Sequence, residues 1–165
     1  MGEASSLRRA FLGLGSNMGE RSEILCGASQ LLAETSGVCE LKLSSWHETA
    51  PVGGPAGQGF YLNGACELVT TLSPEDLLSR CQEIEQRFGR IRGERNGPRT
   101  LDIDLLWYEG ETRDSAALTL PHPGLEERSF VLAPLAELAP DFVLERSGET
   151  VVERAASIQM KEALS

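Results

Sequence analysis

The chain has 165 residues, 41% of them hydrophobic and 24% charged, which suits a single globular domain with a real core. Its net charge of −10 argues against a general nucleic-acid binder, and no stretch is apolar over the length needed to cross a bilayer. We expect a disordered leader over residues 1–8, no signal peptide, and one domain over residues 9–165.

Hydrophobic periodicity and turn residues predict alternating strands and helices. The first half should contain, in order, a strand over 9–17, a helix over 21–36, a strand over 41–48, a Gly- and Pro-rich loop, and a strand over 61–70. The second half should contain a helix from Ser73 to Gly89, a polar loop over 90–98, a strand over 100–108, a helix over about 126–138, a short strand near 142–145 and a final amphipathic helix. This order, β-α-β-β-α-β plus an extension, predicts an α+β fold of the ferredoxin-like type with a mainly antiparallel sheet.

Four cysteines, Cys26, Cys39, Cys66 and Cys81, form no C-x-x-C pair and have no histidine at zinc-ligand spacing. Three of the four lie in apolar or helical patterns, so buried free thiols are expected. Free thiols indicate a reducing compartment, and we expect a cytoplasmic protein.

The stretch "NGPRTLDIDLL" (96–106) is typical of a buried strand that carries two carboxylates. Asp102 and Asp104 project from one face because side chains at i and i+2 share a face, and Leu106 follows them. Two adjacent carboxylates repel, and a divalent cation removes that repulsion. Hard oxygen ligands suit Mg²⁺, with substrate phosphates completing its shell. An exposed strand face with two solvated aspartates is the alternative interpretation.

A cluster of arginines lies just before this strand, within twenty positions of an otherwise acidic chain. It consists of Arg80, Arg87, Arg90, Arg92, Arg95 and Arg99. Arginine binds phosphate oxygens in a bidentate way, and carboxylates with metal opposite arginines are what phosphoryl transfer needs. Surface ion pairs with Glu83, Glu85 and Glu94 are the alternative.

Other polar and aromatic residues are weaker candidates. "GLGSNMGER" lacks the spacing of a phosphate loop and favours a tight strand-to-helix turn. Tyr61, Asn63 and Phe130 could hold a flat heterocycle, but on the local pattern alone Tyr61 and Phe130 are interpreted as core residues. His122, between two prolines, could donate to phosphate or act as a general acid, whereas His47 is expected to be structural.

Several stretches together resemble the 6-hydroxymethyl-7,8-dihydropterin pyrophosphokinase family of folate biosynthesis. They are "FLGLGSNMGER", "SSWHETAPVGGPAGQGFYLNGA", "GPRTLDIDLL" and "LPHPGLEERSFVLAPLAELAPD", in the family's order and over nearly the whole chain. The resemblance implies a ferredoxin-like αβα sandwich. It also implies transfer of pyrophosphate from ATP to the pterin hydroxymethyl group with release of AMP. From the sequence itself we expect a monomer, because there is no obvious unpaired apolar stripe, and no nucleic-acid or membrane partner, because of the net charge and the lack of a long apolar stretch.

The resemblance also implies roles for individual residues. Two Mg²⁺ ions would bind Asp102 and Asp104, and Arg90, Arg99 and His122 would be catalytic. The pterin would be bound by Thr49, Val52, Tyr61, Asn63 and Phe130. ATP would be bound by Gln82, Glu85, Arg92, Leu105, Thr119 and Arg128. The chain departs from the family pattern at Asn96, Ala117 and Pro123. These departures affect how the loop would close over ATP and how tightly adenine would be bound.

Three other functions fit parts of the pattern. A ferredoxin-like RNA-binding module would need aromatic residues exposed on its sheet and a basic face. A metal-dependent nuclease or phosphatase could use the same D-x-D pair. A non-catalytic interaction domain could keep the fold alone.

Overall fold

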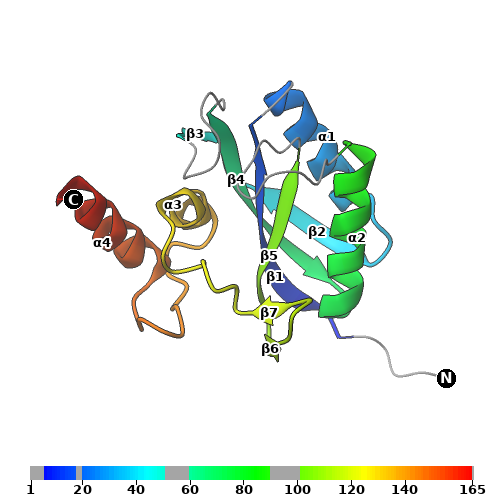
Figure 1. The fold of residues 1–165 in the computed structure, drawn as a ribbon. Helices are drawn as coiled ribbons and strands as arrows, with labels where there is room; N and C mark the ends of the chain where they lie inside the picture. Colours follow the sequence, from blue (N-terminus) through cyan, green and yellow to red (C-terminus); the bar gives the residue numbers. More distant parts are fainter. Residues whose placement is uncertain (1–5, 18–19, 51–59, 90–100, 165) are drawn as a thin grey trace.

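A five-stranded antiparallel sheet is the centre of the molecule (Figure 1), and its strands run in the order β2-β4-β1-β5 with β3 also paired to β4. The computed structural model describes residues 6–17, 20–50, 60–89 and 101–164. The strands are β1 (Arg8–Ser16), β2 (Val38–Leu43), β3 (His47–Thr49), β4 (Tyr61–Thr70), β5 (Asp102–Tyr108), β6 (Arg113–Asp114) and β7 (Thr119–Leu120). The helices are α1 (Arg21–Ala33), α2 (Pro74–Arg87), α3 (Ser129–Leu138) and α4 (Val151–Leu164).

Helices cover both faces of the sheet, which confirms the predicted αβα architecture. Helices α1 and α2 lie on one face and α3 and α4 on the other (Figure 1). Each face has its own hydrophobic core: Leu12, Leu68 and Leu105 belong to the α1–α2 side, and Phe11 and Leu106 to the α3–α4 side. An RNA-binding module of this fold would leave one sheet face open. Because α3 and α4 occupy that face here, this alternative is not supported.

Helix α2 shows why its boundaries could be predicted from sequence. The Ser73 side chain accepts a hydrogen bond from the Asp76 backbone N–H at 3.1 Å, and Pro74 occupies the first helical position. Gly89 follows the helix with a φ of 71°, a left-handed conformation that favours glycine. The N-cap and the terminating glycine are both local signals, and both are confirmed.

The predicted strand over 41–48 is wrong as a single element, because the chain forms β2 and β3 with a break between them. In the break, the Trp46 ring lies over Gly64 of β4 so closely that a Cβ there would be 2.3 Å from it. The Ser44 hydroxyl accepts the Ala65 N–H at 2.8 Å and so replaces a regular ladder contact. This break directs β3 toward α3, where it becomes one wall of the site.

Other boundaries differ in smaller ways. Helix α1 ends at Ala33, three residues early, and α3 begins at Ser129 rather than near 126. The strand predicted near 142–145 is a single bridge between Val143 and Thr150, and the short β6–β7 pair was not predicted. The prediction for the leader falls mainly on residues 1–5, which lie outside the described residues, and β1 begins at Arg8.

The cysteines are only partly as expected. Cys66 and Cys81 are buried, and burial is the main cause that raises the pKa of both thiols, to about 12 for Cys81. Cys26 and Cys39 are exposed, so the prediction of buried thiols is wrong for Cys26, whose helical position faces solvent. All four thiols are free. No helix in the described part of the chain has both the length and the apolar character needed to cross a membrane.

Candidate functional site

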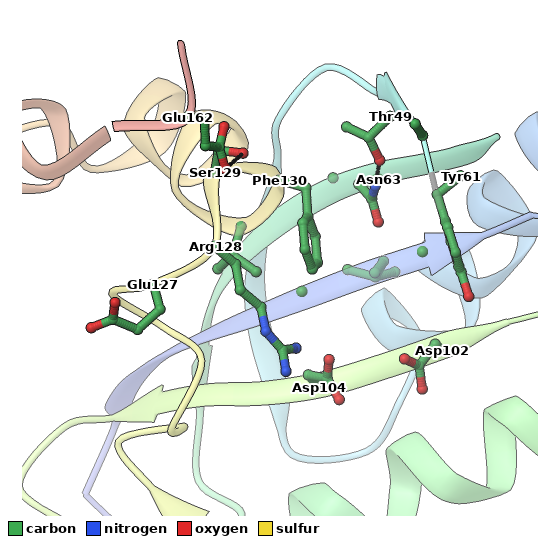
Figure 2. Close-up of a pocket in the computed structure, with 16 residues that line it drawn as sticks. Thr49, Tyr61, Asn63, Asp102, Asp104, Glu127, Arg128, Ser129, Phe130 and Glu162 are labelled. Atoms are coloured by element: carbon green, nitrogen blue, oxygen red, sulfur yellow. Dashed lines mark hydrogen bonds between the residues drawn. The ribbon is translucent and has the colours of Figure 1, made fainter. Parts of the chain in front are cut away.

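The two aspartates of β5 project into one cavity of about 690 Å³ on the α3–α4 side of the sheet (Figure 2). Ile103 and Leu105, which alternate with them, are buried in the opposite core with α1 and α2. Leu106 lies on the cavity side, in the core beneath α3 and α4. The predicted division of this strand into a polar face and a core face is therefore confirmed.

Neighbouring strands complete the floor of the cavity. In the sheet, Gly15 of β1 is paired with Asp102 on one side and with Asn63 of β4 on the other. Asn63 and Asp102 are therefore two strand spacings apart, roughly 10 Å between Cα atoms. Gly13 is likewise paired with Asp104. These glycines leave the space between the amide and the carboxylates open.

The predicted pterin residues in the described part of the chain meet in this cavity. Thr49, Tyr61, Asn63 and Phe130 all line it, from β3, β4 and α3. The Asn63 Nδ2 donates a hydrogen bond to the Thr49 Oγ1 at 2.6 Å, which fixes the orientation of the amide. A Cβ on Gly15 would lie 2.7 Å from the Asn63 Oδ1, so only glycine permits this arrangement. Val52 lies outside the described residues.

Arg128 brings a positive charge to the side of the cavity next to Asp102 and Asp104. Its guanidinium points toward Asp104 in Figure 2, and its Cζ lies 5.7 Å from the centre of the Phe130 ring. A Cβ on Gly124 would lie 2.6 Å from the Arg128 Nε, so this glycine allows the side chain to pack closely on the backbone. Arg128 was predicted to bind ATP, and its place beside the aspartates suits contact with a phosphate.

His122 lies near Arg128 and Asp102, and hydrogen bonds of its backbone N–H and of its ring fix its position. Its N–H donates to the Leu106 carbonyl at 2.8 Å, and its Nδ1 accepts from the Gly124 N–H at 2.9 Å. Burial is the main cause that lowers the pKa of His122, and the positive charge of Arg128 adds to it, while Asp102 opposes it. The neutral ring with its proton on Nε2 is therefore favoured, which suits a hydrogen-bond donor better than a general acid.

The other residues predicted to bind ATP are dispersed. Gln82 is exposed on α2, Thr119 is half-buried in β7, and Leu105 is 3% exposed in the opposite core. Glu85 is also only 3% exposed, and its Oε2 accepts the Ile103 N–H at 2.8 Å. The described residues do not bring these four into the cavity. The arginines predicted here, Arg90, Arg92 and Arg99, lie outside the described residues.

The alternative interpretation of the arginine cluster was a set of surface ion pairs. It holds for Arg80, which forms an ion pair of 2.7 Å with Glu83. Glu85, which was also named as an ion-pair partner, is instead buried against β5.

The cavity also contains residues that sequence reasoning missed: Glu127, Ser129 and Glu162. The Ser129 hydroxyl donates to the Glu162 carboxylate of α4 at 3.0 Å. Nothing in the local sequence links positions 33 apart.

Asp102 and Asp104 are suitable ligands for a hard cation. Within the described ranges, no group of three or more histidine, cysteine, aspartate or glutamate side chains could hold a metal ion. A cation at this pair would thus need oxygens from a substrate or water, which is how Mg²⁺ is bound in nucleotide sites. A pair of carboxylates without histidine or cysteine is a hard-oxygen donor set that fits Mg²⁺.

Comparison with known proteins identifies similar chains. Residues 11–140 match the family described as 7,8-dihydro-6-hydroxymethylpterin-pyrophosphokinase (HPPK). The chain is 46% identical over 144 residues to a 2-amino-4-hydroxy-6-hydroxymethyldihydropteridine pyrophosphokinase of Synechocystis sp., covering 87% of this chain and 73% of that protein. It is 45% identical over 152 residues to the protein of the same name from Methylorubrum extorquens, covering 92% and 94%.

A similar fold occurs in the Plasmodium falciparum HPPK-DHPS structure with pterin and p-hydroxybenzoate. The TM-score is 0.72 at 15% sequence identity, over 99% of this chain and 44% of that one. The chain therefore spans less than half of that longer protein. At this identity the likeness supports the fold alone.

Proposed function

Because the chain belongs to the 7,8-dihydro-6-hydroxymethylpterin-pyrophosphokinase family, we propose that the cavity above β5 is its active site. The family activity is ATP-dependent transfer of pyrophosphate to hydroxymethyldihydropterin in folate synthesis. One observation carries the proposal for this cavity: the Asp102–Asp104 pair, Asn63 of β4 and Phe130 of α3 all line the same space of about 690 Å³. That volume is in the range of small-molecule pockets, roughly 300–1,000 Å³.

The pterin is proposed to bind between Phe130 and the β3–β4 wall. The Phe130 ring offers a flat apolar surface for a heterocycle, and Tyr61 lines the same space from β4. The Asn63 amide and the Thr49 hydroxyl are held by their mutual hydrogen bond and can read the polar edge of the ring. Val52 is proposed to extend this wall from the neighbouring loop.

Asp102 and Asp104 are proposed to hold two Mg²⁺ ions together with the ATP phosphates. Bound there, the ions would supply charge neutralisation and a template for the phosphate chain. The Cα atoms of Asp102 and Asn63 are two strand spacings apart, roughly 10 Å, so a pterin hydroxymethyl group and a phosphate can meet between these two residues. The pairing of β4, β1 and β5 sets this separation, which would align the two substrates when both are bound.

In the proposed reaction the hydroxymethyl oxygen attacks the β-phosphorus of ATP, and the hydroxyl proton is released to solvent. The new O–Pβ bond forms as the bond from Pβ to the oxygen on the α-phosphorus breaks, and AMP leaves. Arg128 faces the charge that develops on the phosphates, and His122 can donate through Nε2–H. Arg90 and Arg99 are proposed to stabilise the transferred group, with Arg92 on the ATP side. Gln82, Glu85, Leu105 and Thr119 are proposed to bind or support ATP.

The test is an incubation with ATP, Mg²⁺ and 6-hydroxymethyl-7,8-dihydropterin, followed by separation of nucleotides. AMP and the pterin pyrophosphate should form in equal amounts, and omission of Mg²⁺ should stop the reaction. ADP, or free phosphate without the pterin product, would instead indicate a kinase, phosphatase or nuclease reaction at the same aspartates. Titration of Mg²⁺ against ATP measures how many ions the complex needs.

We further propose that the protein acts as a monomer in the cytoplasm. The exposed free thiols of Cys26 and Cys39 are compatible with a reducing compartment. Size-exclusion chromatography with light scattering should give a mass near 17.9 kDa at micromolar concentration.

A further inference from the structure

Three polar side chains outside the cavity form one hydrogen-bonded group, which we call the Glu137 cluster: Ser45, His47 and Glu137. The Glu137 carboxylate accepts from the Ser45 backbone N–H at 2.8 Å and contacts the Ser45 hydroxyl at 2.8 and 3.0 Å. The His47 Nε2 lies 2.5 Å from the Glu137 Oε2. The group thus joins the start of β3 to α3, across 90 residues of sequence.

The cluster has the residue types of a hydrolytic triad but the wrong geometry. In a triad the histidine uses one ring nitrogen for the carboxylate and the other for the hydroxyl. Here the His47 Nε2 faces both Glu137, at 2.5 Å, and Ser45, at 3.4 Å. The Ser45 hydroxyl also donates to the carboxylate itself, so it is not activated as a nucleophile. A second hydrolytic site is excluded, and the group must act by holding the two elements together.

Its position connects the two walls of the pterin cavity. His47 is paired with Asn63 in the sheet and lies two residues before Thr49 on β3, so both side chains face the α3 side. Glu137 lies seven residues after Phe130 on α3, two helical turns away on the same face. The bond from His47 to Glu137 therefore crosses between the wall that carries Asn63 and Thr49 and the wall that carries Phe130.

Apart from the Glu137 cluster, β3 is held by its pairing with β4 and by an ion pair of 2.9 Å between Glu48 and Arg21 of α1, and α3 packs directly on β4 as well as on β3. β3 is three residues long, pairs only along β4 in the sheet, and is followed at residues 51–59 by chain outside the described residues. The main cause that lowers the pKa of Glu137 is the hydrogen bond from the Ser45 N–H, so the carboxylate is ionised near neutral pH. It then accepts hydrogen bonds from Ser45 and His47 at once.

We propose that the Glu137 cluster is a positioning device that fixes the spacing between Phe130 and the Asn63–Thr49 pair, and so determines affinity for the pterin but not for ATP. The inference rests on the proposed binding of the pterin in this cavity. None of the three residues lines the cavity in which the pterin is proposed to bind. They act through the elements that do, and their loss should widen or loosen the slot between the Phe130 ring and β3.

The experiment measures kcat and both KM values for Glu137→Ala and His47→Ala, with melting temperatures. Each variant should raise the KM for the pterin about tenfold, as expected for loss of one or two hydrogen bonds, while kcat and the KM for ATP change less than twofold. Glu137→Gln keeps an oxygen that can accept from the Ser45 N–H and should recover part of the affinity. Glu75→Gln is the matched control, because Glu75 also bridges two elements, through Arg113, on the far side of the sheet.

Each outcome is decisive. Equal rises in both KM values, or a pterin KM as in wild type with Glu137→Ala folded, would overturn the inference. If Glu137→Ala does not fold, His47→Ala carries the same test. Phe130→Ala in the same assay separates the two proposals: a raised pterin KM there with no effect of Glu137→Ala leaves the pocket assignment standing and removes only the positioning role. No effect of either variant overturns both.

Discussion

The two faces of β5 differ sharply in what surrounds them. One face directs Asp102 and Asp104 into the cavity, beside Arg128 and facing Phe130. The other directs Ile103 into the core against α1 and α2, where it is 5% exposed. A single seven-residue strand thus carries the proposed chemistry on one side and packing on the other. Because strand side chains alternate, activity and stability should be separable by substitutions one residue apart.

The largest effect is expected on the cavity face. Asp104→Asn and Asp102→Asn should each reduce kcat by about 10³-fold or more, roughly 4 kcal/mol of transition-state stabilisation, because a neutral amide is a poor ligand for Mg²⁺. Both side chains are only partly buried, so the free energy of unfolding should change by less than about 0.5 kcal/mol. Steady-state turnover and urea unfolding measure the two quantities.

The matched control is Asp114→Asn, an exposed aspartate on β6. It makes the same chemical change outside the cavity and should leave kcat as in wild type. If all three variants behave alike, the contrast between the two faces is lost, and the aspartates of β5 are solvated side chains without a catalytic role.

The core face should show the opposite result. Ile103→Ala removes a buried side chain from the α1–α2 core and should lower the free energy of unfolding by about 3 kcal/mol. Its effect on kcat, measured where the variant is fully folded, should be far smaller than that of either aspartate. Val152→Ala, at a position on α4 that is 47% exposed, should cost almost nothing. A large loss of turnover with unchanged stability for Ile103→Ala would contradict the separation.

Glu85 sharpens the comparison because it is a carboxylate on the core side. Its Oε2 accepts the N–H of Ile103, the residue between the two aspartates, so it supports the backbone from which they project. Glu85→Ala should lower the free energy of unfolding by about 2 kcal/mol, the usual cost of losing a hydrogen bond to a charged group. Glu83→Ala, an exposed neighbour on α2, is the control and should change it by less than about 0.5 kcal/mol.

The KM for ATP decides what else Glu85 does. The family resemblance predicts contact with ATP, whereas the side chain is 3% exposed in this structure. A stability loss with an unchanged KM for ATP would assign Glu85 to support of β5. A raised KM with unchanged stability would assign it to the nucleotide.

Sequence reasoning succeeded where the signal was local. The i, i+2 spacing of Asp102 and Asp104 predicted their common face, and the limits of β4 were predicted to the residue. It failed where distant packing decides. The break before β3 depends on Trp46 lying over Gly64, a contact between strands that no periodicity contains.

The same reason explains the missed cavity residues. Glu162 reaches the cavity only because α4 packs beside α3, and residues 33 apart then meet at Ser129. The i, i+2 spacing of Gly13 and Gly15 on one strand face could be read from the sequence. Their role beside the aspartates could not, because it depends on β1 being the neighbour of β5. The Asn63–Thr49 hydrogen bond likewise requires the pairing of β3 with β4.

The smallest expected effect concerns His122 and the pH dependence of stability. Its pKa is lowered in the folded state, mainly by burial and then by Arg128, so the folded protein binds the proton less readily than the unfolded chain. Between the folded pKa and the ordinary value of about 6.5, the unfolded state holds more protons, and stability must fall as pH falls. Above that window His122 is neutral in both states and contributes no slope.

Urea unfolding of wild type and His122→Gln at several pH values between 5 and 7.5 measures this contribution. The wild-type free energy of unfolding should decline toward pH 5 more steeply than that of the variant, and the two slopes should coincide above about pH 7. If wild type and His122→Gln have the same slope over the whole range, His122 is not a group that resists protonation in the folded state.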